Sequence, residues 1–161
     1  MQRLPALRRW QSEALVRFEA SGADDFLAVA TPGAGKTTFA LMAARRALLA
    51  RRAGRLLVIV PTAHLKTQWA DAADGFRLLL ETGWSSRASL PGDVHGAVLS
   101  YQQVAANPRA VAGIARGAFA VLDEIHHAGE SRAWGDALRH ALSPAAVRLC
   151  ISGTPFRSDD A

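Results

Sequence analysis

The segment FLAVATPGAGKTTFALMAARRALL (residues 26–49) decides the fold of this chain. Its first five residues, 26–30, form an apolar run that predicts a buried strand. Residues 31–35 contain proline and two glycines and cannot continue that strand, because proline lacks an N–H donor and glycine permits unusual dihedrals. The Ala/Leu-rich stretch 36–49 predicts a helix. A strand, a glycine-rich loop and a helix in this order are typical of a loop that holds phosphate oxygens on its backbone N–H groups.

This loop predicts a site for ATP and Mg²⁺. We expect Lys36 to reach the β- and γ-phosphates and the Thr37 hydroxyl to ligate Mg²⁺. The usual pattern is GxxxxGK[ST], and this chain departs from it at its first position, which is Ala30. The residues predicted to bind ATP in this segment are Thr31, Pro32, Gly33, Ala34, Gly35, Lys36, Thr37 and Thr38.

A second motif places two adjacent carboxylates after an apolar run. Residues 118–122 predict a strand, and Asp123 and Glu124 follow it directly. Ligands of open α/β sheets bind at the carboxyl ends of strands. We therefore expect Asp123 to hold Mg²⁺ and Glu124 to act in catalysis, together with Lys36, by orienting the attacking water. A surface Asp-Glu turn is the alternative, but ionisable groups that end a hydrophobic strand need a reason to be there.

Strand and helix patterns alternate along the whole chain. The strands are predicted at 26–30, 56–60, 76–80, 97–100, 118–122 and 147–152. The helices are predicted at 7–20, 36–49, 63–72, 108–116 and 132–142. Strands separated by helices indicate an α/β fold with a parallel sheet covered by helices on both faces, in which residues 56–60 are buried on both sides.

Composition agrees with one domain that has its own core. The chain has 161 residues, of which 50% are hydrophobic and 20% charged. Its formal charge of +5 fits a polyanionic partner. Only two of the 19 basic residues are lysine, however, and a GC-rich genome explains such an arginine-rich chain equally well. The single cysteine excludes an internal disulfide. Neither a membrane-length apolar run nor a signal-peptide pattern is found, so we expect no membrane partner and a cytoplasmic location.

Taken in order, the motifs of this chain resemble the first motor domain of superfamily 2 helicases and translocases of the DExH type. The matching segments are LRRWQ (7–11), ATPGAGKT (30–37), VIVPTAHLKTQW (58–69), VLSYQQV (98–104), DEIHH (123–127) and SGTPFR (152–157). A leading alanine is common in the phosphate loop of this family, so the departure at Ala30 favours it. Within the family, three of these segments look most like XPB-type and restriction-enzyme-type DNA translocases, and less like DEAD-box RNA proteins.

The resemblance implies further site residues. It implies that Gln11 recognises adenine and that the coupling between ATP and the rest of the motor passes through His126, Ser152, Gly153 and Thr154. It also implies nucleic-acid contacts from Pro61, Thr62, Ser100, Tyr101 and Gln102. Simple helix capping is the alternative for Thr62 and for the segment 100–102.

The resemblance implies a RecA-like P-loop NTPase domain over residues 1–161 whose second RecA-like domain is absent from this chain. We expect the ATP-binding half of an ATP-dependent helicase or translocase, acting on DNA rather than RNA. Because the second domain supplies an arginine finger, worth about 10³ to 10⁵ in turnover, this chain alone should hydrolyse ATP very slowly. A translocase subunit of a restriction system and a non-catalytic ATP- or nucleic-acid-binding module are the alternatives.

Overall fold

The computed structural model of the chain describes residues 3–29, 35–85, 89–124 and 132–153. The strands are β1 (Asp25–Val29), β2 (Leu56–Val60), β3 (Leu80–Glu81), β4 (Gly96–Ser100), β5 (Phe119–Asp123) and β6 (Val147–Ser152). The helices are α1 (Arg9–Ser21), α2 (Lys36–Leu49), α3 (Ala63–Asp74), α4 (Tyr101–Ala106), α5 (Pro108–Ala115) and α6 (Arg132–Leu142).

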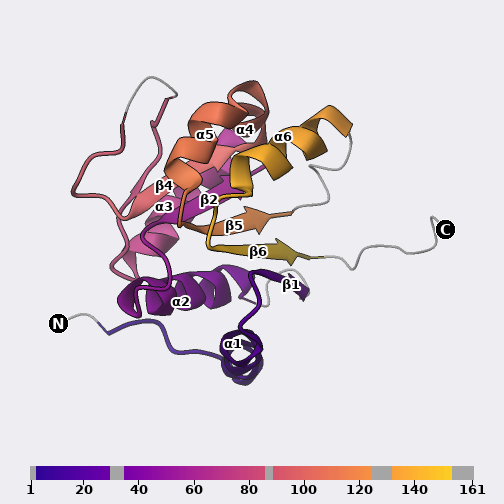
Figure 1. Cartoon of the computed structure of the whole chain (residues 1–161). Helices are drawn as coiled ribbons and strands as arrows, with labels where there is room; N and C mark the ends of the chain where they lie inside the picture. Colours follow the sequence, from indigo (N-terminus) through magenta and orange to yellow (C-terminus); the bar gives the residue numbers. More distant parts are fainter. Residues whose placement is uncertain (1–2, 30–34, 86–88, 125–131, 154–161) are drawn as a thin grey trace.

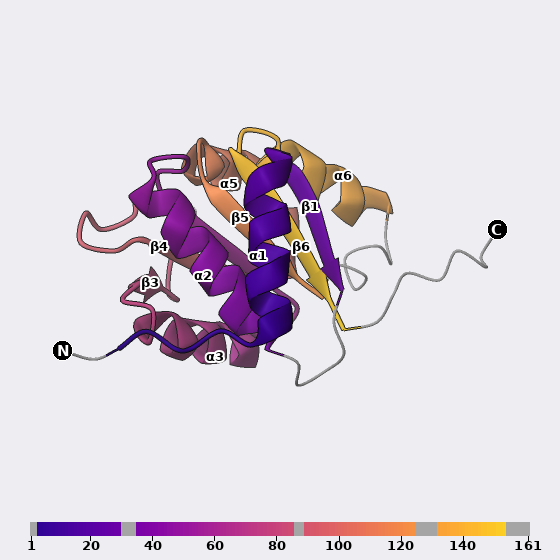
Figure 2. The same cartoon turned by 90° about the horizontal axis from the view of Figure 1, so that it is seen from below.

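The strands form one parallel sheet in the order β1-β6-β5-β2-β4-β3. Helices cover both faces, with α4, α5 and α6 on one side and α1, α2 and α3 on the other (Figures 1 and 2). The predicted α/β fold is therefore confirmed. Because all strands run in the same direction, their carboxyl ends lie at one edge of the sheet. The segments that carry the sequence motifs come directly after these strand ends.

Two hydrophobic layers hold this arrangement together. Side chains of α1, α2 and α3 pack on one face of the sheet, and those of α4, α5 and α6 pack on the other. Successive side chains of β2 point into alternate layers. Leu56 and Val58 belong to the first layer, and Leu57 and Ile59 belong to the second. All of β2 is therefore fully buried, as its unbroken apolar sequence predicted.

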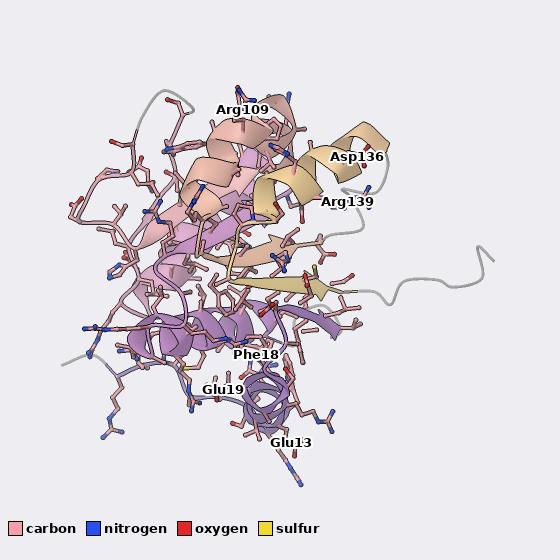
Figure 3. All side chains as sticks on the ribbon, in the orientation of Figure 1. Glu13, Phe18, Glu19, Arg109, Asp136 and Arg139 are labelled. Atoms are coloured by element: carbon pink, nitrogen blue, oxygen red, sulfur yellow. The ribbon has the colours of Figure 1, made fainter. Side chains whose placement is uncertain are left out.

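Helix α1 shows how one amphipathic face attaches an outer element to this core. Phe18 points from α1 toward the sheet, while Glu13 lies on the opposite side of the helix (Figure 3). The Phe18 ring meets Phe26 edge-on at 5.3 Å between ring centroids and lies 5.8 Å from Phe119. Such aromatic contacts stabilise beyond the area that they bury, so α1 stays fixed over β1.

Two predictions about local structure were wrong. The segment 76–80 is a turn that leads into the short strand β3, because Arg77 takes a left-handed φ of 59° while Phe76 and Leu78 remain buried in the core. Helix α4 was absent from the predicted helices, although helix capping was the alternative for segment 100–102, and it begins directly after β4. Its start is a capping box in which the Ser100 hydroxyl accepts from the Gln103 N–H and the Gln103 side chain accepts from the Ser100 N–H.

Among the described residues, none of the helices is long and apolar enough to cross a membrane.

Candidate nucleotide-binding site

The two motifs that the sequence singled out meet at the carboxyl edge of the sheet. Lys36 begins α2, and Glu124 follows β5. Their side chains form an ion pair of 2.9 Å between Lys36 Nζ and Glu124 Oε1, although the residues lie 88 positions apart in the chain. Strand β6 lies between β1 and β5 in the sheet. Both side chains are largely shielded from solvent, with 13% of Lys36 and 27% of Glu124 exposed.

The backbone at Glu124 has an uncommon conformation. Its φ is +51°, which lies in the left-handed region that non-glycine residues seldom enter. Its N–H still donates to the Ile151 carbonyl at 3.0 Å, so β5 remains attached to β6 up to this residue. The left-handed turn therefore begins where the sheet ends. Strained positions of this kind gather at functional sites.

Asp123 is buried at the end of β5 and is held from two sides. The indole Nε1–H of Trp69 donates to its Oδ2 at 2.9 Å, and the Tyr101 hydroxyl donates to its backbone carbonyl at 2.7 Å. Burial raises the pKa of the Asp123 carboxyl, and the neighbouring Glu124 raises it further. The hydrogen bond from Trp69 and the charge of Lys36 lower the pKa of the same carboxyl and so favour its ionised form.

Oxygen donors at this edge fit a magnesium ion. Asp123 offers a carboxylate, and Thr37 offers a hydroxyl in the first turn of α2, where it is partly buried. Within the described residues, His, Cys, Asp and Glu form no group of three that could hold a metal. Mg²⁺ needs no such group, because it prefers oxygen ligands and keeps several waters and substrate phosphates in its coordination shell.

Gln11 lies in α1 and is bonded to the end of the phosphate loop. Its side chain is 2% exposed; its Oε1 accepts from the Arg8 N–H at 2.6 Å, and its Nε2 donates to the Gly35 carbonyl at 2.7 Å. Both ends of the amide are bonded inside the protein, and each keeps a further donor or acceptor position, so adenine recognition by Gln11 stays a prediction. Gly35 makes this contact feasible, since its φ is +87° and a Cβ there would lie 2.3 Å from Gln11 Nε2. Gln11 therefore ties α1 to the end of the phosphate loop.

The segments expected to contact nucleic acid lie at the ends of β2 and β4. Thr62 is exposed and caps α3, since its Oγ1 accepts from the Leu65 N–H at 3.4 Å. Gln102 is exposed, and Pro61 and Ser100 are partly buried. Tyr101 is 1% exposed, so its side chain offers no surface to a nucleic acid. That part of the prediction is corrected: the ring fills the core because it starts α4, and its hydroxyl reaches Asp123.

The residues expected to couple the site to the rest of the motor are only partly described. Ser152 is fully buried at the end of β6, in register with Val29 of β1. Gly153 follows it and is partly buried. Thr38 is also partly buried, in the first turn of α2. The other predicted site residues lie outside the described residues: Thr31, Pro32, Gly33, Ala34, His126 and Thr154.

Trp69 belongs to this site as well, although no sequence motif indicated its role. Its ring is buried, as a packing residue would be, but its N–H is bonded to the Asp123 carboxylate. A buried indole N–H generally finds an acceptor, so the tryptophan at this position was a signal that some acceptor exists. The identity of that acceptor could not be predicted, because 54 residues separate the partners.

Known proteins share sequence and fold with this chain. A family model described as the type III restriction enzyme, res subunit, matches residues 4–157. Uncharacterized proteins of Mycobacterium tuberculosis and Mycobacterium leprae are 46% identical over 159 residues and 47% identical over 157 residues. These alignments cover 97% and 96% of this chain and 26% of each relative. A Halobacterium salinarum protein with the name "Putative DNA 3′-5′ helicase Rad25" is 31% identical over 163 residues, which cover 96% of this chain and 24% of that protein.

Solved structures share the fold at lower identity. The Sulfolobus solfataricus SWI2/SNF2 ATPase core in complex with dsDNA has a TM-score of 0.79 and 18% identity, over 96% of this chain and 33% of that one. The type ISP restriction-modification enzyme LlaGI, with a DNA substrate mimic, has a TM-score of 0.71 and 19% identity, over 96% of this chain and 18% of that one. The chain spans about a quarter of the length of the curated relatives that it matches.

Proposed function

Since this chain belongs to the type III restriction enzyme res-subunit family, whose matched region is the first motor domain of superfamily 2 helicases, we propose that it is the ATP-binding half of an ATP-dependent DNA helicase or translocase. The observation that carries the proposal is the ion pair between Lys36 and Glu124, beside the buried Asp123. A cation that follows a phosphate loop and two carboxylates at the carboxyl end of β5 are residues that phosphoryl transfer uses.

Each residue of the site has its own role in ATP binding and hydrolysis. Lys36 binds the β- and γ-phosphates of ATP. These phosphates compete with the Glu124 carboxylate for the ammonium group of Lys36. When the phosphates take Lys36, the Glu124 carboxylate is released from the ion pair and can orient the attacking water. Asp123 and Thr37 would hold Mg²⁺, which would supply positive charge to neutralise the phosphates. Gln11 supports the end of the phosphate loop through the Gly35 carbonyl.

We propose DNA as the partner on the same edge of the sheet. The relatives named above include a DNA helicase and DNA-bound structures, and this chain carries a formal charge of +5. Thr62 and Gln102 are exposed where β2 and β4 end and are placed to contact the backbone of a strand. Ser152, Gly153, Thr154 and His126 would then pass the nucleotide state toward this surface and toward the second domain.

A second RecA-like domain completes the site in this proposal. The relatives are about four times as long as the chain, which leaves room for such a domain in the whole protein. An arginine finger from that domain would raise turnover by about 10³ to 10⁵. The LlaGI similarity favours a restriction translocase as a second candidate. Both candidates use the same residues here, and a nuclease assay of the full-length protein distinguishes them.

The test is the Glu124→Gln variant of the full-length protein, assayed for ATP binding and for ATP hydrolysis with and without DNA. We expect hydrolysis to fall by at least about 10²-fold, as for loss of a general base, while ATP binding is retained because the phosphates no longer compete with a carboxylate for Lys36. Glu13→Gln is the matched control, because Glu13 pairs with Arg9 on the exposed face of α1. Unchanged hydrolysis in Glu124→Gln would overturn the proposal, and a wild type that hydrolyses no ATP with or without DNA would favour a non-catalytic binding module.

A further inference from the structure

Trp69 lies at the centre of a contact that the proposed chemistry does not use. Its side chain is 3% exposed in α3, on the face that packs against the sheet. Its Nε1–H reaches Asp123 Oδ2 at 2.9 Å, and both partners are buried. Helix α3 begins at the exposed cap Thr62, seven residues earlier, so the same rigid element carries a surface residue and a bond to the buried carboxylate.

The bond restricts how Asp123 can bind a cation. A carboxylate that accepts a hydrogen bond on one oxygen has its plane fixed and keeps its second oxygen for another ligand. Asp123 is buried, and the donor at 2.9 Å gives one of its oxygens a hydrogen-bond partner inside the protein. The Tyr101 hydroxyl holds the backbone of the same residue at 2.7 Å, so Asp123 is fixed through its main chain as well.

We propose that Trp69 is a positioning residue that orients Asp123 for Mg²⁺ and joins this carboxylate to helix α3, so that nucleic acid bound at Thr62 acts on the metal site. The inference rests on the proposed function. Seven residues of helix span about 10 Å, which makes α3 a short and stiff connection. A hydrogen bond weakens steeply when its geometry changes, so a small shift of α3 on DNA binding alters the hold on Asp123.

The test compares Trp69→Phe with the wild type in the full-length protein. Phenylalanine keeps an aromatic ring in the core and removes the N–H donor. The measurement is the equilibrium binding of a fluorescent, non-hydrolysable ATP analogue, titrated with Mg²⁺ in the presence and absence of DNA. We expect the Mg²⁺ concentration at half-saturation to rise about tenfold in Trp69→Phe, as for loss of a residue that supports a metal ligand, and to lose its dependence on DNA.

Trp10→Phe is the matched control, since Trp10 packs against Phe39 with 6.1 Å between ring centroids, whereas the indole N–H that reaches Asp123 belongs to Trp69. Its Mg²⁺ midpoint should equal that of the wild type. An unchanged midpoint in a folded Trp69→Phe protein would overturn the inference alone. A wild type whose analogue binding ignores Mg²⁺ would overturn the proposed function and the inference together.

A measurement on the wild type covers the case in which Trp69→Phe does not fold. The indole N–H signal of Trp69, assigned by elimination from variants of the other tryptophans, should shift when Mg²⁺ and the analogue bind, and shift again on adding DNA. A signal that stays in place through both additions would show that the bond to Asp123 takes no part in either event.

Discussion

Replacing Tyr101 by phenylalanine tests how the end of β5 is held. Phe119 N–H donates to the Arg55 carbonyl, and the parallel register pairs Leu56 with Phe119. Continued along the strands, this pattern turns the Asp123 carbonyl toward the backbone nitrogen of residue 61. That residue is Pro61, which has no N–H to donate. The Tyr101 hydroxyl, 2.7 Å from the carbonyl oxygen, takes the place of the missing donor.

Tyr101→Phe therefore leaves a buried carbonyl without this donor while the ring still fills its space. A buried acceptor left without a partner costs about 1–3 kcal/mol, so we expect the free energy of unfolding to fall by that amount. Equilibrium denaturation by urea measures it, with Gln102→Ala as the control at an exposed neighbour, for which a change within about 0.5 kcal/mol is expected.

The double variant Pro61→Ala/Tyr101→Phe makes the test specific. Alanine at position 61 supplies the N–H that the register directs at the Asp123 carbonyl, so the loss caused by Tyr101→Phe should be smaller in the Pro61→Ala background. The double-mutant cycle removes the effect of proline on the unfolded chain, and we expect a coupling of about 1 kcal/mol. A loss below about 0.5 kcal/mol for Tyr101→Phe, or equal losses in both backgrounds, would refute the reasoning.

The remaining predictions concern stability in other parts of the sheet. Gly96→Ala should destabilise the protein by about 3 kcal/mol or more, because the added Cβ would lie 1.6 Å from the rigid Leu56 carbonyl oxygen. In Gly113→Ala the added Cβ meets no atom within 4 Å in α5, so this variant should be stabilised by up to about 1 kcal/mol. Thermal melts of the two variants measure both effects. Arg148→Met should reduce stability at neutral pH, since Arg148 bonds Asp25 and carbonyls at the end of α6. The hydrogen bond from Arg148 lowers the pKa of Asp25. The contribution of this bond to stability is therefore present above the ordinary carboxyl range and is lost as the pH falls through the lowered pKa. The free energy of unfolding should therefore differ less between pH 6 and pH 3 in Arg148→Met than in the wild type. Denaturation at both pH values measures this difference, and an equal difference in both proteins would contradict this account.

The sequence predicted most of the local structure because the relevant signals are local. Apolar runs bounded by proline or glycine marked the strands, and α2, β2 and β6 begin and end where their patterns predict. Segment 76–80 shows where this reasoning fails, because buried Phe76 and Leu78 suit a core-facing turn as well as a strand. Helix α4 was missed because its six residues are too short to show a helical period.

By itself, the sequence determined the class of fold and the chemistry of the edge where Lys36, Asp123 and Glu124 lie. The tertiary structure alone decided which groups hold these residues: Trp69 for the Asp123 carboxylate, Tyr101 for its carbonyl and Gln11 for Gly35. The physical reason is that a buried donor or acceptor must find a partner, but its choice depends on the strand order and on which helix face meets the sheet. Those contacts join segments 22 to 54 residues apart, and no local pattern encodes them.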